Sequence, residues 1–263
     1  MVDLVTYISQ TEFLIEVEKG LIPGHSLIHK FGRNDSTGTT LEPVTMGGVY
    51  QTPQAASATT VRVKAGGNAN DTAAGTGARE VTFIGLDETG VVITEAVATA
   101  GASASAATTA TFMRIYRAYV SASGTYATAI AGSHAGDIVI ENGSGGTDWL
   151  TIDSTIFPMG QTEIGVFSVP IATTAYILRA NAFADSTKTT DLIFFCRGGI
   201  MESAAPYSRM NPLFTLSLKG GHAPWESSSG VRVAGPADMG FMAQVGVGTA
   251  VVAVDFEILL VAD

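Results

Sequence analysis

The chain has 263 residues, of which 46% are hydrophobic and only 14% charged, and its net charge is −10. A nucleic-acid-binding protein needs clustered Lys and Arg to neutralise phosphates, so this acidic balance argues against that class. No stretch of about 18 consecutive apolar residues occurs, which excludes an ordinary membrane-spanning helix.

Residues 1–40 differ in pattern from the rest and are predicted to form an extended N-terminal arm. Ser9 and Glu12 have the spacing of a capping box, which predicts at most a short helix that stops at Gly20 or at Pro23-Gly24. The first residues have neither a basic region nor a following apolar region, so no signal peptide is expected and synthesis in a cytoplasm is predicted.

The segment 19–33 contains Lys19, Lys30, Arg33 and two histidines with no acidic residue between them. It is either a solvated turn or a surface that lies on an acidic partner. His25 and His29 are four residues apart, a spacing that brings two imidazoles together only in a helix. Pro23-Gly24 directly before them argues against a helix there, and no metal site is predicted.

From residue 41 onward the chain consists of short β-type runs separated by Gly, Asn and Asp turns, and residues 41–151 are predicted to form a β-rich domain. The clearest feature is a hairpin of residues 81–86 and 91–97, joined by a short loop that contains Gly90. Residues 98–111 contain only Ala, Thr, Ser and Gly, so we expect an exposed strand edge, a long loop or a flexible linker. Further strands are expected at 112–120, 137–141 and 149–153.

Residues 152–263 repeat this style with longer runs and are predicted to form a β-sandwich, jelly-roll-like domain. Strands are expected at 165–169, 175–183, 192–197, 213–218, 239–245 and 250–261. In the last of these, apolar residues alternate from Val252 to Leu260 while Asp255 and Glu257 lie on the other face, so one face must be buried. The predicted fold class is therefore all-β, a β-sandwich or jelly roll with an N-terminal extended arm. The two β regions are either separate sandwiches or one elaborated sandwich.

Sequence signatures of catalysis are absent: the chain has neither a Gly-x-Ser-x-Gly motif nor a phosphate-binding loop. Two acidic pairs, Asp87/Glu88 and Asp255/Glu257, could act as acid and base in glycoside hydrolysis, but their positions in a turn and on a solvent-facing strand argue against it. The turn at residues 66–71 offers oxygen atoms for a cation, although Asn and Asp are also favoured in turns for conformational reasons. Cys196 lies in an apolar run and is expected to be a small core residue. We therefore predict no enzyme, catalytic residue, cofactor or metal.

Several blocks of the sequence together resemble a family of structural proteins encoded by tailed bacteriophages of aquatic bacteria. These blocks are residues 23–34 (PGHSLIHKFGRN), 47–50 (GGVY) with Pro53, 70–79 (NDTAAGTGAR) leading into 85–87 (GLD), 169–177 and the closing 256–261 (FEILLV). The resemblance covers most of the chain, and its first two blocks are the more specific ones.

This resemblance implies a virion component without catalytic residues, and within the virion a capsid cement or decoration protein, a type that is typically a trimer of jelly-roll subunits. The implied partners are the major capsid protein and other copies of the chain, and the implied location is the capsid surface. The part tied to the shell would be His25, His29, Lys30, Phe31, Arg33 and Asn34, and deletion of residues 1–33 would leave the β body folded. A tail, neck or receptor-binding component is the main alternative, and a polysaccharide-acting enzyme, which a low-charge, Gly-rich surface would also suit, is the other.

Overall fold

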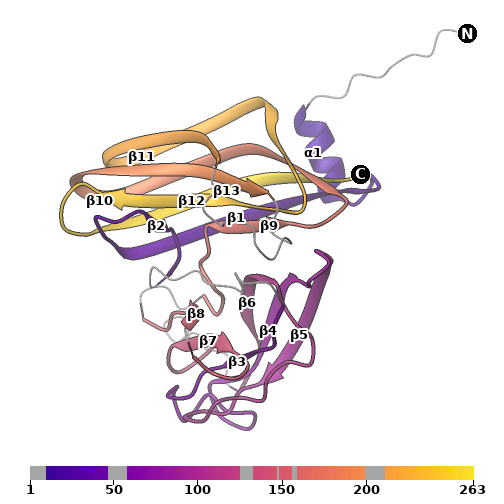
Figure 1. The fold of residues 1–263 in the computed structure, drawn as a ribbon, viewed down its shortest axis with the longest axis vertical. Helices are drawn as coiled ribbons and strands as arrows, with labels where there is room; N and C mark the ends of the chain where they lie inside the picture. The colour runs from indigo at the N-terminus through magenta and orange to yellow at the C-terminus, as the bar shows by residue number, and fades with distance from the viewer. Residues whose placement is uncertain (1–9, 47–57, 125–132, 147, 156–158, 199–210) are drawn as a thin grey trace, which may run out of the picture.

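The computed structural model describes residues 10–46, 58–124, 133–146, 148–155, 159–198 and 211–263. Within these ranges the chain is all-β except for one short helix, and its sheets pack into a barrel-like sandwich, which confirms the predicted fold class. The block 47–50 with Pro53, and the capping residue Ser9, lie outside the described residues. Figure 1 shows a larger β body, which includes the first and last strands of the chain, and a smaller β body below it.

The larger body is a seven-stranded sheet in the order β1-β13-β10-β12-β2, with β11 paired to β10 and β9 paired to β12. Its strands are β1 (His25–Thr37), β2 (Glu42–Pro43), β9 (Val166–Val169), β10 (Thr173–Gly198), β11 (Asn211–Ala234), β12 (Ala237–Val245) and β13 (Ala250–Ala262). The expected alternation of β13 is confirmed, because Val252, Val254, Phe256 and Ile258 are buried.

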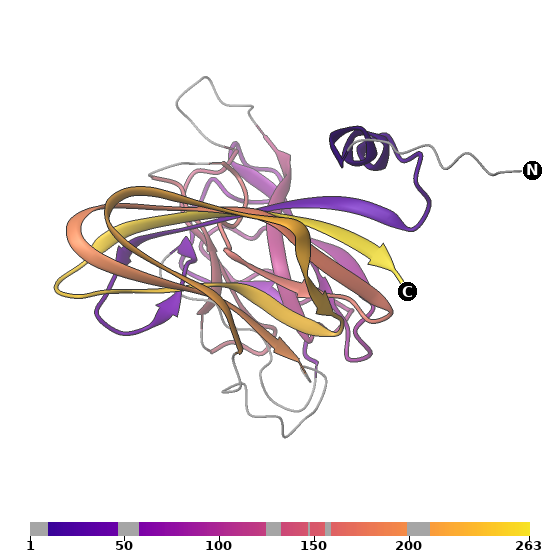
Figure 2. The same cartoon turned by 90° about the horizontal axis from the view of Figure 1, so that it is seen from above.

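This sheet folds into a sandwich because its longest strand, β10, changes one of its partners along its length. The first part of β10 pairs with β13 and the second part with β12, with a register shift between Ala184 and Thr189, and β11 follows β10 through the same bend. The two layers meet through aromatic rings: Phe256 of β13 packs edge-on against Phe194 of β10, with centroids 5.2 Å apart. The curvature of the strands is visible from above in Figure 2.

The smaller body consists of two three-stranded sheets, β5-β4-β6 and β3-β7-β8. These strands are β3 (Val61–Val63), β4 (Ala78–Leu86), β5 (Val92–Ala98), β6 (Arg114–Ser123), β7 (Ile138–Asn142) and β8 (Asp148–Ile152). The predicted hairpin is β4 and β5, which are paired from Glu80↔Ala98 to Leu86↔Val92.

The Ala/Ser/Thr-rich segment 98–111 contains a loop that forms hydrogen bonds with the backbone of strand β3. The buried hydroxyls of Ser105 and Thr108 accept hydrogen bonds from the backbone N–H groups of Val63 and Val61, at 2.9 and 3.0 Å. The backbone N–H groups of the same two loop residues donate to the carbonyls of Val63 and Val61. Small hydroxyl side chains thus replace a neighbouring strand, and this part of the loop is not a linker.

The smaller body is inserted between β2 and β9 of the larger one. Strand β1 is extended, as expected of an arm, but it pairs with β13 from His25↔Val261 to Thr37↔Ala250, so residues 25–37 belong to the body of the sheet. The predicted division into 1–40, 41–151 and 152–263 therefore needs correction, because the first and last of these regions build one sheet. Deleting residues 1–33 would remove most of an edge strand and is not expected to leave the body intact.

A close crossing of backbones holds β1 against the segment that leads into β9. A Cβ atom at Gly32 would lie 2.1 Å from the backbone nitrogen of Gly165 and 2.4 Å from the carbonyl oxygen of Val44. Neither neighbour is the end of a flexible side chain, so only glycine fits at position 32.

Helix α1 (Gln10–Glu18) lies beside β1 at the edge of the larger body (Figures 1 and 2). It ends where predicted: the N–H of Gly20, which has a φ of 71°, donates to the carbonyl of Val17 at 2.9 Å. Among the described residues, no helix is long and apolar enough to cross a membrane.

Candidate functional site

Strand β1 carries all six residues that the resemblance assigns to partner binding, but two of them face the interior. Lys30 is 8% exposed and its Nζ donates to the Tyr116 carbonyl at 2.7 Å, while Asn34 is 1% exposed and its Nδ2 donates to Glu42 Oε1 at 3.1 Å. Both side chains have partners within the chain, so neither is directly presented to another protein.

The other four residues are partly or fully accessible. His29 is exposed, with Nε2 3.8 Å from Asp255, and the half-buried Phe31 ring lies 6.4 Å from the His29 ring. His25 packs edge-on against Phe13 of α1 at 5.8 Å, and Arg33 is half-buried. Both histidines stand on a strand, in agreement with the sequence argument against a helical metal pair.

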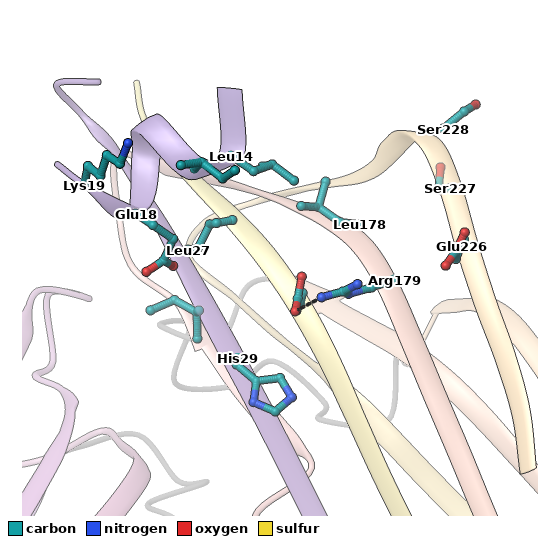
Figure 3. A pocket seen from close by; sticks show the side chains of 13 residues that line it. Leu14, Glu18, Lys19, Leu27, His29, Leu178, Arg179, Glu226, Ser227 and Ser228 are labelled. Atoms are coloured by element: carbon teal, nitrogen blue, oxygen red, sulfur yellow. Dashed lines mark hydrogen bonds and ion pairs between the residues drawn. The ribbon is translucent and has the colours of Figure 1, made fainter. Parts of the chain in front are cut away.

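Two hollows flank β1, and Leu27, Ile28 and His29 line both of them. The first, the helix-side hollow, lies between α1 and the sheet and has a volume of about 950 Å³ (Figure 3). Leucine side chains and charged groups alternate around it, for example Leu178 beside Arg179. Its lining residues are Leu14, Ile15, Glu18, Lys19, Leu27, Ile28, His29, Leu178, Arg179, Glu226, Ser227, Ser228 and Glu257.

Charges in the helix-side hollow are partly neutralised within the chain. Arg179 of β10 forms an ion pair with Glu257 of β13, and this hydrogen bond raises the pKa of Arg179. Arg179 is 56% exposed, so the pair contributes little to stability. Three carboxylates and the two cations Lys19 and Arg179 line this hollow together, so it offers no concentrated charge of one sign for a ligand.

The second hollow, which we call the joint hollow, lies between the two bodies and has a volume of about 550 Å³. Its lining residues are Leu27, Ile28, His29, Lys30, Phe31, Ile84, Val92, Tyr116, Arg117, Gln161, Thr162, Phe167, Pro170 and Leu260. Burial, reinforced by the positive charge of Arg117, lowers the pKa of Lys30 to about 7, and burial raises the pKa of Tyr116 to about 12.

A buried carboxyl group, that of Glu163, lies near the C-terminal part of β1, where Arg33 and Asp35 are located. Burial raises the pKa of Glu163 to about 7; the charge of Arg33 opposes this shift, and Asp153 and Asp35 add to it. Glu163 is 3% exposed. The charges of Arg33 and Asp35 on β1 thus interact with Glu163, which lies in the segment that leads into β9.

Asp71, from the turn weighed for cation binding, and Asp87, from a pair weighed for catalysis, both have structural roles. The buried Asp71 carboxylate accepts hydrogen bonds from the backbone N–H groups of Ala78, Ala135 and Gly136, which fits the turn interpretation. Asp87 organises the β4–β5 turn through Thr89 and Val91. In the described part of the chain, no group of three or more His, Cys, Asp or Glu residues could hold a metal ion.

The remaining candidates pack against the core. Cys196 is half-buried, and burial raises the pKa of its thiol, which makes it a poorer nucleophile. Trp149 is 6% exposed, and Trp225 stacks on Phe214 with centroids 4.1 Å apart. Both tryptophan side chains thus pack against the apolar core.

Sequence reasoning missed the groups from distant segments that complete these hollows. Arg117 and Tyr116 come from β6, and Arg179 and Glu226 from β10 and β11. The alternation Arg114-Ile115-Tyr116-Arg117 identifies a strand but carries no signal that one arginine is buried and the other lines a hollow.

Comparisons with known proteins identify no family. No protein-family description and no curated protein matches the chain. Among solved structures, the chain is similar to the VP2 subviral particle of infectious bursal disease virus, with a TM-score of 0.12 and 10% identity over 94% of this chain and 86% of that one. A T=1 particle derived from the same virus gives a TM-score of 0.12 and 9% identity over 94% and 83%. Likeness at this level carries no argument about fold or function.

Proposed function

We propose that this protein is a structural subunit of a tailed-phage virion, a capsid cement or decoration protein that binds the assembled shell of major capsid protein. The observation that carries the proposal is the position of the segment 23–34, the most specific block of the resemblance. Residues 25–34 of it lie in β1, a terminal strand of the sheet, which within the described ranges pairs with β13 alone. A partner chain can therefore meet this segment at the rim of the body.

The exposed side of β1 has the chemistry of a protein contact. His29 and Phe31 supply an imidazole and a phenyl ring at alternate positions of the strand, and Arg33 is the next residue on the same face. Aromatic side chains and Arg are enriched in the centres of protein interfaces. The low content of charged residues in the chain reduces repulsion between neighbours packed on a shell.

Self-association, as a trimer, is the second part of the proposal, and an apolar patch between two turns supports it. The backbone N–H of Ile171 donates to the carbonyl of Gly90 at 3.0 Å, which brings the β4–β5 turn beside the β9–β10 turn. Val91, Val92 and Ile171 at this junction are 49%, 45% and 46% exposed. Such a patch would be covered by another copy of the chain.

Sedimentation with phage heads that lack this protein tests shell binding. The purified chain should pellet with the heads and raise the temperature at which they rupture. The variant Phe31→Ser combined with His29→Ala should lose most of this binding. The matched control is His222→Ala, since His222 is also an exposed histidine on a strand. Undiminished binding by the double variant would reject β1 as the contact, and failure of the unmodified chain to bind would reject the cement function.

Analytical ultracentrifugation tests the trimer. Ile171→Asp should shift the chain to monomers because it places a charge in the apolar patch. Val247→Asp is the control, since Val247 is 65% exposed in the β12–β13 turn. A monomer in the unmodified chain at high concentration would contradict this part of the proposal.

A further inference from the structure

The joint hollow contains two cations without an acidic counterpart. Lys30 comes from β1 of the larger body and Arg117 from β6 of the smaller one. None of the described carboxylates forms an ion pair with either side chain. No Asp or Glu is among the residues that line the hollow. In a chain of net charge −10, this is an unusual concentration of unpaired positive charge.

Both cations keep donor groups free for a ligand. The ammonium group of Lys30 has three N–H donors, of which one is directed to the Tyr116 carbonyl. The Nε of Arg117 donates to Gln161 Oε1 at 3.2 Å, and its guanidinium lies 4.8 Å from the centre of the Tyr119 ring. The terminal nitrogens of Arg117 have no described hydrogen-bond partner.

The rest of the hollow is largely apolar. Its apolar lining residues include Ile84, Val92, Phe167, Pro170 and Leu260. A volume of about 550 Å³ lies within the range of small-molecule sites, which combine mostly apolar walls with a few convergent polar groups. The hollow therefore selects for a molecule with one anionic group and an apolar body.

We propose that the joint hollow binds a small organic carboxylate. Its carboxylate accepts hydrogen bonds from Lys30 and Arg117, and its apolar part lies against Phe167 and Leu260. Because Lys30 and Arg117 belong to different bodies, the bound anion contacts both of them. His29 and Phe31 line this hollow and also belong to the proposed shell contact, but the titration of the isolated chain with variants of Lys30 and Arg117 does not depend on shell binding, so either proposal can fail without the other.

Binding becomes weaker as pH rises, because an anion needs the charged form of Lys30. The other titratable groups at the hollow are Arg117 and Tyr116 of β6 and His29 of β1. Tyr116 stays neutral because burial raises its pKa to about 12. The Nε2 atom of His29 lies 3.8 Å from the carboxylate of Asp255. The variant His29→Gln should therefore retain the pH dependence, and Lys30→Met should lose it.

Isothermal titration calorimetry with octanoate tests the site on the full chain. One octanoate should bind per chain, and both Arg117→Gln and Lys30→Met should weaken binding about tenfold or more, the loss expected for one charge-assisted hydrogen bond. Arg232→Gln is the matched control, because Arg232 is an exposed arginine on β11 away from the hollow.

Two further ligands separate charge from hydrophobicity. Octanol should bind about tenfold more weakly or worse because it lacks the anion, and acetate should bind weakly because it lacks the apolar body. No binding of octanoate, equal binding of octanol, or full affinity in Arg117→Gln would each overturn the proposal. Arg117 is largely exposed, so this variant remains informative if Lys30→Met fails to fold.

Discussion

The guanidinium Nε of Arg114 lies 3.1 Å from Oδ2 of Asp238, and both side chains are fully buried. Arg114 begins β6 of the smaller body and Asp238 lies near the start of β12 of the larger one. The same carboxylate accepts a hydrogen bond from Ser168 at 2.7 Å and pairs with Arg197 at 2.8 Å. One carboxylate thus joins four strands and fixes the two bodies to each other.

Replacing Asp238 should weaken the fold strongly. Asp238→Asn removes the buried carboxylate with which both Arg114 and Arg197 pair, and the free energy of unfolding should fall by about 3–5 kcal/mol in urea titrations. Asp148→Asn, which removes a partly exposed partner of Lys64, serves as the control and should change it far less. Equal effects of the two substitutions would show that the buried network does not hold the joint.

Lys30 should make stability depend on pH in the alkaline range. Its pKa is lowered in the folded state from 10.5 to about 7, so its stabilising contribution is present above about pH 10.5 and is lost as pH falls towards 7. Lys30→Met removes this loss and should raise the free energy of unfolding by roughly 3–4 kcal/mol near pH 6, with little gain near pH 10. Urea midpoints at both pH values measure this. A gain that does not change with pH would contradict a buried, titrating amine.

Glu163 should act in a different pH window. Its pKa is raised in the folded state from 4.5 to about 7, so its contribution is fully present below about pH 4.5 and is lost as pH rises through 7. Glu163→Gln should therefore stabilise the chain at about pH 8 and have little effect near pH 4.5. Thermal unfolding temperatures of the variant and the unmodified chain at both pH values give the comparison. The opposite trend would mean that pairing with Arg33 outweighs burial.

Gly32 should tolerate no side chain. An added Cβ would meet backbone atoms of Gly165 and Val44, which can move only if β1 or the entry to β9 moves. Gly32→Ala should cost about 1–3 kcal/mol or more by overpacking. Gly38→Ala is the control, because a Cβ there meets nothing within 4 Å. Similar stability of the two variants, measured by chemical denaturation, would contradict the close crossing.

Local patterns were sufficient to predict the short-range parts of the fold. The alternation in 250–261 identified both the strand and its buried face, and the run 81–97 identified a hairpin. The long strands are harder to predict from local patterns. The sequence predicts two separate strands, 175–183 and 192–197, in place of β10, because the polar residues between them look like a turn. The structure keeps that segment in β10, with a register shift, since β11 bends with it.

Long-range pairing and buried charge could not be predicted from one sequence. Nothing in residues 25–37 shows that they pair with the last strand of the chain, so the sequence alone predicts an extended arm there. Lys30 and Asn34 were expected at a surface because Lys and Asn are mostly exposed. The burial of Lys30 depends on a partner far along the chain, Tyr116. The burial of Asn34 depends on the turn that brings Glu42 to it.

The number of copies of this chain in a purified virion tests the central claim most directly. Quantitative protein gels that compare its band with that of the major capsid protein give this number. A cement protein covers the whole shell through closed symmetric contacts, so we expect copies on the order of hundreds. About a dozen copies would place the chain at a single vertex, in a tail or neck, and absence from the particle would contradict a virion role altogether.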